Sequence, residues 1–105
     1  MKALLLTIAL AGSMLAAGQA SAEDGKTIAQ KSGCLACHSL DKKVLGPAYK
    51  DIAAKYKGDK TAEAKLIEKV KKGGSGTWGP MLMPANSPQV KDEDIKAIVK
   101  WVLSL

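Results

Sequence analysis

Cys34-Leu35-Ala36-Cys37-His38 contains both cysteines and the one histidine of the 105-residue chain. The spacing C-x-x-C-H is the attachment signature of a c-type haem, in which each thiol adds to one vinyl group of the porphyrin. Residues three apart on a helical turn lie on one face, so Cys34 and Cys37 can reach the same porphyrin edge. His38 follows directly and can bind the iron. The stretch therefore predicts one covalently attached haem with His38 as an iron ligand.

Three other kinds of site use cysteines at this spacing. A thiol–disulfide oxidoreductase of the thioredoxin kind needs a strand–helix setting, and the sequence shows no convincing strand. A zinc site needs three or four ligands, so with no further Cys or His it would have to recruit carboxylates. A structural disulfide between Cys34 and Cys37 suits an exported protein but leaves His38 without a role. The haem interpretation accounts for all three residues.

The N-terminus has the three parts of a secretory signal peptide. Lys2 supplies a positive charge, residues 3–17 form an apolar run, and residues 20–22 (Ala-Ser-Ala) provide a cleavage site. An uncleaved membrane anchor is the alternative, but the strongly apolar run is shorter than the roughly 20 residues that a spanning helix needs. We therefore expect residues 1–22 to be removed on export, which leaves one domain of 83 residues, 23–105.

The chain is basic, with a formal net charge of +6, and every basic residue is a lysine. A basic surface can meet nucleic acid, an anionic membrane or an acidic protein. Export and the absence of arginine and of interleaved aromatic residues argue against nucleic acid. Some of these lysines are expected only to solvate helix faces. The others suggest steering toward an acidic redox partner, which raises the association rate more than the affinity.

Apolar residues recur at spacings of three and four in several segments, which predicts short amphipathic helices. The expected helices cover approximately residues 24–31, 47–57, 61–72 and 92–103. These segments account for four short helices, and the sequence shows no convincing strand. The sequence has no Phe, two Trp and two Tyr, so the core is expected to be thin. A domain this small often needs a staple, and a large flat cofactor would complete its core.

Residues 73–90 form the second informative region because they are too rich in Gly and Pro for regular structure. Long irregular loops in small domains are often functional. Met81 and Met83 are the methionines that follow the expected leader, and either one would complete the His/Met ligand pair of electron-transfer cytochromes. Pro84 restricts Met83 to extended backbone, which suits a side chain directed at iron, whereas methionine elsewhere serves as core filler. If neither bound the iron, the open face would fit a haem enzyme or sensor.

With these motifs in place, the chain resembles a class I cytochrome c of the short bacterial type, a family of periplasmic electron carriers. The matching segments read GCLACHSLDKKVLGPAYKDIAAKY from Gly33, GTWGPMLMPAN from Gly76, and KWVLSL at the C-terminus. The resemblance implies a small all-α cytochrome c fold, with four or five short helices wrapped around one covalent haem. It also implies one-electron transfer between respiratory-chain components in the periplasm.

The resemblance assigns roles to individual residues. It implies two thioether sites and two iron ligands, proximal and distal: Cys34, Cys37, His38 and Met83. Three further residues support the haem. The carbonyl of Pro47 accepts the second N–H of the proximal imidazole, Trp78 contacts a haem propionate, and Asn86 hydrogen-bonds the ligand sulfur. Such contacts around a metal site orient the ligands and tune the iron.

With both axial positions filled, no coordination site is open to a substrate, so we expect an electron carrier without enzyme activity. The implied partners are redox proteins with acidic docking surfaces. A membrane cytochrome complex would be the donor, and a nitrite reductase or terminal oxidase the acceptor. We expect a monomer that binds no nucleic acid. The alternative from a different class is a thiol–disulfide oxidoreductase that uses Cys34 and Cys37.

Overall fold

The computed structural model describes residues 24–105, and the expected signal peptide lies outside them. The elements follow in this order: α1 (Asp24–Lys31), the 3₁₀ turn η2 (Cys34–Ala36), α2 (Tyr49–Lys55), α3 (Ala62–Lys72), β1 (Gly74–Gly76), β2 (Gly79–Met83) and α4 (Asp92–Leu103). The described part is mostly helical, as the sequence predicts. Within residues 24–105, no helix combines the length and the apolar character needed to cross a bilayer.

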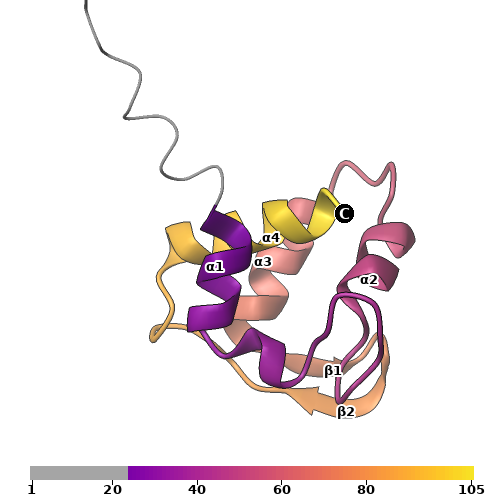
Figure 1. The fold of residues 1–105 in the computed structure, drawn as a ribbon, viewed down its shortest axis with the longest axis horizontal. Coiled ribbons are helices and arrows are strands. Elements are labelled where there is room, and N and C mark those ends of the chain that lie inside the picture. Colours follow the sequence, from indigo (N-terminus) through magenta and orange to yellow (C-terminus); the bar gives the residue numbers. More distant parts are fainter. Residues whose placement is uncertain (1–23) are drawn as a thin grey trace, which may run out of the picture.

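The C-terminal helix α4 is the element against which the other helices pack, since it contacts α1, α2 and α3 (Figure 1). Its apolar residues recur at three and four positions, which places them on one face. The buried residues of this face are Ile95, Ile98, Val99 and Val102. Three acidic residues lie in the first turn of α4, where the helix dipole favours negative charge.

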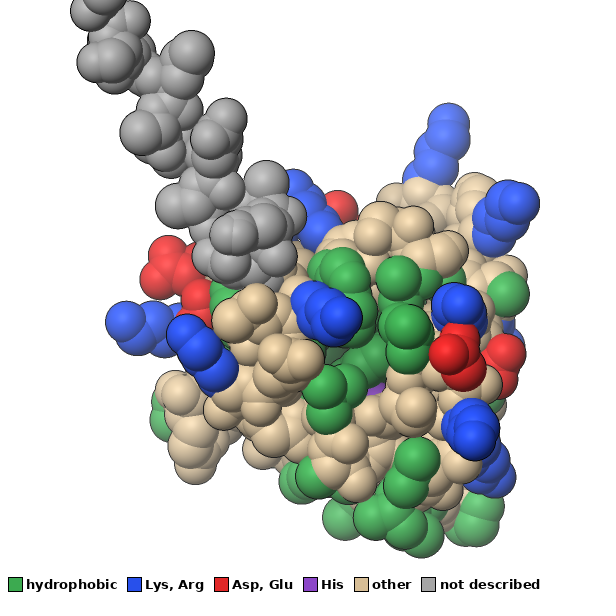
Figure 2. All heavy atoms as spheres, in the orientation of Figure 1, with side chains coloured by type: hydrophobic (Ala, Val, Ile, Leu, Met, Phe, Trp, Pro, Cys, Tyr) green, Lys and Arg blue, Asp and Glu red, His purple; other side chains and the backbone are tan. Residues whose placement is uncertain are grey.

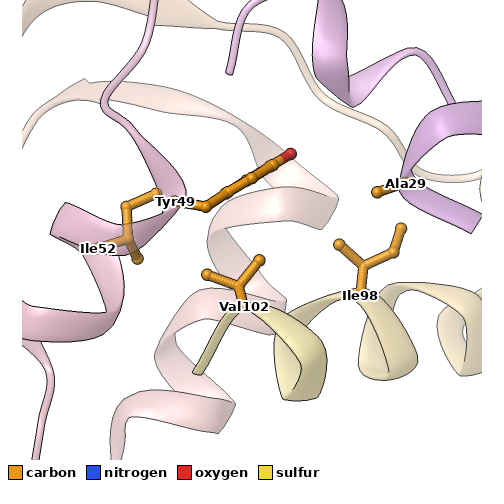
Figure 3. Packing of buried hydrophobic residues seen from close by; sticks show 5 residues of the cluster. All are labelled: Ala29, Tyr49, Ile52, Ile98 and Val102. Carbon is orange, nitrogen blue, oxygen red and sulfur yellow. The ribbon is translucent and has the colours of Figure 1, made fainter. Parts of the chain in front are cut away.

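Figure 3 shows the core cluster where α1, α2 and α4 meet. Ala29 comes from α1, Tyr49 and Ile52 come from α2, and Ile98 and Val102 come from α4. Of the ten buried hydrophobic residues within 24–105, four are alanines, so few large side chains supply the packing volume. The thin core expected from the composition is confirmed.

Helices α1 and α4 approach closely at Gly25. A Cβ atom at this position would overlap Trp101 and lie 2.6 Å from the carbonyl oxygen of Ala97. The absence of a side chain therefore lets the backbone of α1 rest on α4. The Trp101 ring also meets the edge of the Tyr49 ring, with centroids 5.3 Å apart. This contact joins α4 to the start of α2.

Helix α2 begins later than the sequence suggests. Its first residue is Tyr49 and its N-cap is Ala48, so the predicted start at Pro47 is wrong. The reason is that the chain around Pro47 serves another contact, because its carbonyl oxygen lies 2.8 Å from the ring of His38. Because the Pro47 carbonyl faces the imidazole, the regular hydrogen bonds of α2 begin after this residue.

The Gly-rich segment after α3 contains a short hairpin, so the expectation of a wholly irregular loop is wrong. Strands β1 and β2 pair antiparallel, with Gly74 opposite Met83 and Gly76 opposite Gly79, and the register is irregular between these pairs. Gly76 and Gly79 have φ values of 109° and 113°, which side chains rarely adopt. The strands are too short and too rich in glycine to show an alternating apolar pattern, and this explains why the sequence does not reveal them.

Candidate haem-binding site

A pocket of about 360 Å³ lies between the turn η2, helices α2 and α3, and the hairpin. Its walls bring together four residues that the sequence proposes for the haem: Cys34, Cys37, His38 and Met83. Figure 2 shows hydrophobic side chains gathered around a hollow, with the colour of the histidine visible inside it and lysines around its rim. The fold thus unites two sequence regions that lie more than forty residues apart.

The imidazole of His38 is held by three neighbours. Its Nδ1 atom lies 2.8 Å from the carbonyl oxygen of Pro47. A carbonyl only accepts hydrogen bonds, so in the neutral imidazole the proton is on Nδ1 and Nε2 keeps a lone pair. The Tyr49 ring stacks on the imidazole, with centroids 5.0 Å apart and planes 21° apart. A Cβ atom on Gly46 would lie 2.6 Å from Cε1 of the imidazole. The site therefore presents Nε2 as a neutral ligand atom in one fixed orientation.

The loop that follows the histidine returns the Pro47 carbonyl to the ring. The backbone N–H of Gly46 donates to the carbonyl of Cys37 at 2.8 Å, and that of Tyr49 donates to the carbonyl of Ser39 at 2.8 Å. These two hydrogen bonds join the beginning of the loop to its end. The position of the carbonyl is therefore set by backbone contacts that depend little on the exposed side chains between them.

The two thiols lie on and directly after the turn η2. Cys34 and Cys37 are both half-buried and form no disulfide with each other. Gly33 leads into the turn with a φ of 81°, a conformation that favours glycine. Burial raises the pKa of the Cys34 thiol, so this thiol stays protonated at neutral pH. Redox-active thiols have a lowered pKa instead, and the surroundings of Cys34 therefore do not support a thiol–disulfide oxidoreductase.

A zinc site finds no support either. Within residues 24–105, no group of three or more His, Cys, Asp and Glu side chains is placed to hold a metal ion. The ligands that a haem takes from a protein are fewer, because the porphyrin itself supplies four nitrogens. One histidine and one methionine on opposite walls of a pocket would be enough.

Met83 and Met81 both reach the pocket but differ in exposure. Both methionines of β2 line the pocket, as does Leu82 between them. Met81 is 59% exposed, whereas Met83 is half-buried. A Cβ atom on Gly73 would overlap the carbonyl of Met83 and lie 2.8 Å from the backbone nitrogen of Ala85. The end of α3 therefore packs directly on the backbone around Met83.

Trp78 and Asn86 lie on either side of that methionine. Trp78 lines the pocket from the turn of the hairpin and is 40% exposed. The side-chain nitrogen of Asn86 donates to the carbonyls of Val70 at 3.2 Å and Pro84 at 3.3 Å. Both contacts of the amide nitrogen are to backbone carbonyls, and the hydrogen bond from Asn86 to the ligand sulfur stays a prediction. Val70 lies in the last turn of α3, where carbonyls lack a helical partner and accept hydrogen bonds well.

Several pocket residues carry no motif signal in the sequence. Leu66 and Val70, from the apolar stripe of α3, line the pocket and are only partly buried. Lys65 and Lys69 line it as well, and the Lys69 Nζ lies 3.0 Å from the position of a Cβ on Gly74. Residues four apart on a helix share a face, so the sequence places these lysines together. It does not show that this face borders the pocket.

Known proteins resemble this chain over nearly its whole length. Residues 22–105 match the family model described as Cytochrome c. Cytochrome c-551 of Pseudomonas aeruginosa is 47% identical over 100 residues, which cover 95% of this chain and 93% of that relative. Cytochrome c-552 of Nitrosomonas europaea is 45% identical over 105 residues, which cover 100% and 99%.

Solved structures of other proteins have a fold similar to that of this chain. The crystal structure of wild-type Nitrosomonas europaea cytochrome c552 has a TM-score of 0.72 and 48% identity, covering 76% of this chain and 98% of that chain. The class 1 cytochrome MtoD of Sideroxydans lithotrophicus ES-1 has a TM-score of 0.69 and 36% identity, covering 78% and 92%.

A mostly helical domain in which a C-x-x-C-H turn shares an apolar pocket with a methionine defines the small class I cytochromes c. Proteins of this class carry electrons. The chain belongs to the cytochrome c family, and its relatives include the c-551 and c-552 proteins. The family and fold class predicted from the motifs are therefore confirmed, and nothing among the relatives supports a thiol–disulfide oxidoreductase.

Proposed function

We propose that this protein is an exported electron carrier with one haem c, attached through Cys34 and Cys37 and ligated by His38 and Met83. When bound, the haem supplies a one-electron couple between ferrous and ferric iron. The observation that carries the proposal is the pocket itself, which joins two thiols, an imidazole nitrogen with a free lone pair and a half-buried thioether.

The residues around the pocket fit a haem in polarity as well as in ligand type. Aliphatic and aromatic side chains from α2, α3 and α4 contribute to the wall: Tyr49, Ile52, Leu66, Val70, Ile98 and Val102. An apolar wall excludes water from the iron, which supports a high reduction potential. The ammonium groups of Lys65 and Lys69 are suited to the carboxylates at the edge of a porphyrin.

Met83 is the better candidate for the distal ligand. A ligand bound to iron must be withdrawn from water, and Met83 is half-buried whereas Met81 is 59% exposed. The close packing of Gly73 on the Met83 backbone also gives this residue the more constrained position. A constrained side chain loses less entropy when it binds the iron.

With His38 and Met83 both bound, no coordination position remains for a substrate. The protein would therefore transfer electrons without catalysing a reaction at the metal. An open distal face would fit a haem enzyme or a sensor instead. Binding of carbon monoxide to the reduced native protein tests this point, because ready binding means that Met83 is not a firm ligand.

We further propose that residues 1–22 are a cleaved signal peptide and that residues 23–105 form the periplasmic domain. The match to the family model begins at residue 22. The crystal structure from Nitrosomonas europaea covers 76% of the 105 residues, or about 80 residues, close to the 83 that follow Ala22. Both observations support a domain boundary near residue 22.

This protein would be a monomer, and its partners would be redox proteins with acidic docking surfaces. Lys42 and Lys43 are exposed in the loop after the haem-attachment motif, and the backbone of Lys43 pairs with that of His38. Positive charge so close to the pocket would guide an acidic partner to it. Suitable partners are a membrane cytochrome complex as donor and a nitrite reductase or terminal oxidase as acceptor.

The direct test is the haem content of protein purified from the periplasm. Denatured and reduced protein in alkaline pyridine should show the spectrum of a haem, and acidified organic solvent should fail to extract it. Two titratable free thiols in a colourless protein would contradict the proposal and would reopen the oxidoreductase alternative.

A further inference from the structure

Lys55 makes two contacts with aromatic rings at the edge of the pocket. Its Nζ lies 5.9 Å from the centroid of the Tyr56 ring and 5.5 Å from that of the Trp78 ring. Both distances fall within the roughly 6 Å over which an ammonium group is attracted to the face of a ring. The two rings line the pocket, whereas Lys55 itself is exposed. The lysine therefore contacts the pocket wall from the solvent side.

We propose that Lys55 is a positioning residue that holds Trp78, and with it the hairpin β1–β2, against helix α2. This inference rests on the proposed function, because the hairpin carries the distal ligand Met83 at its end. Lys55 is the last residue of α2, and Trp78 lies in the turn between the two strands. The contact thus joins the helix that begins beside His38 to the strand that ends at Met83.

The hairpin has few other constraints at its turn. Two short strands alone are marginally stable in water, and both glycines that flank the turn adopt positive φ angles. The opposite end is anchored, since the backbone N–H of Asn86 donates to the carbonyl of Val70 at 3.0 Å. Lys55 supplies a contact at the free end. Its position at the C-terminus of α2 is itself favourable, because the helix dipole attracts positive charge there.

Release of the turn would allow β2 to move away from the pocket. The distal methionine would then leave the iron more often, and an exogenous ligand would enter more readily. An exposed contact of this kind changes an equilibrium constant by about 2- to 5-fold. The rate at which cyanide binds the ferric protein is therefore expected to rise by about the same factor when the contact is lost.

Three single variants of the haem-loaded protein separate this role from a simple loss of charge. Lys55→Gln removes the charge and the ring contacts, Lys55→Arg keeps both, and Lys57→Gln removes one charge two residues further along. Cyanide should bind the Lys55→Gln protein about 2- to 5-fold faster, while the other two variants stay at the parent rate. The near-ultraviolet circular dichroism of the tryptophans should change in the same variant only. Equal cyanide rates for Lys55→Gln and Lys57→Gln would overturn the proposal.

A double-mutant cycle tests whether Lys55 acts through Trp78. In a Trp78→Leu background, Lys55→Gln should have no further effect on the cyanide rate, and its effect on the unfolding equilibrium should shrink to the part contributed by the Tyr56 contact. A full effect in that background would also overturn the proposal. Failure of the proposed function is recognised separately, because a protein without haem, or one in which Met83→Ala leaves the cyanide rate unchanged, refutes the ligand assignment. The coupling between Lys55 and Trp78 in the unfolding equilibrium stays measurable in either case.

Discussion

The Nδ1 atom of His38 and the carbonyl oxygen of Pro47 lie 2.8 Å apart, and this hydrogen bond determines what the histidine can do. It fixes the proton on Nδ1 and leaves Nε2 free to bind a metal. It also explains why α2 starts after Pro47. The neighbouring Gly46 leaves room for the imidazole, so ligand geometry and loop geometry are determined together by adjacent residues.

Gly46→Ala should lower the haem content of the protein. The added Cβ would lie 2.6 Å from Cε1 of His38, and the ring would have to leave its hydrogen bond with Pro47. We expect less than half of the parent haem-to-protein ratio in material from the periplasm. Gly58→Ala is the control, because a Cβ atom on Gly58 would enter open space, although the φ of 82° at Gly58 strains any side chain. This control should lose stability and keep its haem. Equal haem contents in the two variants would contradict the role of Gly46.

Met83→Ala should lower the reduction potential and open the iron to carbon monoxide. Loss of a thioether ligand removes the group that favours ferrous iron. A decrease on the order of 0.1 V is expected, a modest part of the ≈ 0.8 V range that axial ligands span. Met81→Leu is the matched control and should change the potential little, because Met81 is 59% exposed. Redox titration measures both variants, and reversed effects would show that Met81 is the ligand.

The sequence is informative wherever chemistry requires particular residues at a particular spacing. The thiols and the histidine can be predicted because haem attachment leaves little freedom in their order. The face of α4 that carries Ile95 and Ile98 can be predicted because burial imposes a helical period. Spacing alone does not separate the two methionines of β2, but Pro84 and the family resemblance favour Met83, and the lower exposure of Met83 agrees with this choice.

Other features depend on contacts between distant segments. Asn86 donates to the carbonyl of Val70, sixteen residues earlier, and no local pattern reveals this pairing. The stacking of Tyr49 on His38 depends likewise on the loop that returns the chain to the ring. The hairpin is missed because its glycines serve backbone conformation and leave no side-chain period. From the sequence alone, Lys65 and Lys69 are expected on a solvated helix face. The structure shows that they line the pocket.

Ile95→Ala should destabilise the haem-loaded protein by about 2–5 kcal/mol, because the side chain is fully buried and its removal leaves a cavity. Val44→Ala removes branched aliphatic carbons from a position that is 53% exposed and outside the pocket lining, and should cost less than about 0.5 kcal/mol. Chemical denaturation followed by far-ultraviolet circular dichroism measures both values. Similar losses for the two variants would mean that α4 is not the centre of the core.

Charge reversal at Lys42 and Lys43 should slow electron transfer to an acidic partner at low ionic strength. Both side chains are exposed beside the haem-attachment loop. A decrease of about tenfold is expected at low salt. The difference should disappear near 1 M salt, where the Debye length is about 3 Å. Reversal of Lys96 and Lys100, on the exposed face of α4, is the control and should have a smaller effect. Equal slowing at all salt concentrations would argue against electrostatic docking.

The intact mass of the protein purified from the periplasm tests the covalent haem most directly. We predict the mass of residues 23–105 plus that of one haem, retained after denaturation in acid and organic solvent. A mass equal to that of the polypeptide alone, with two free thiols, would contradict the account.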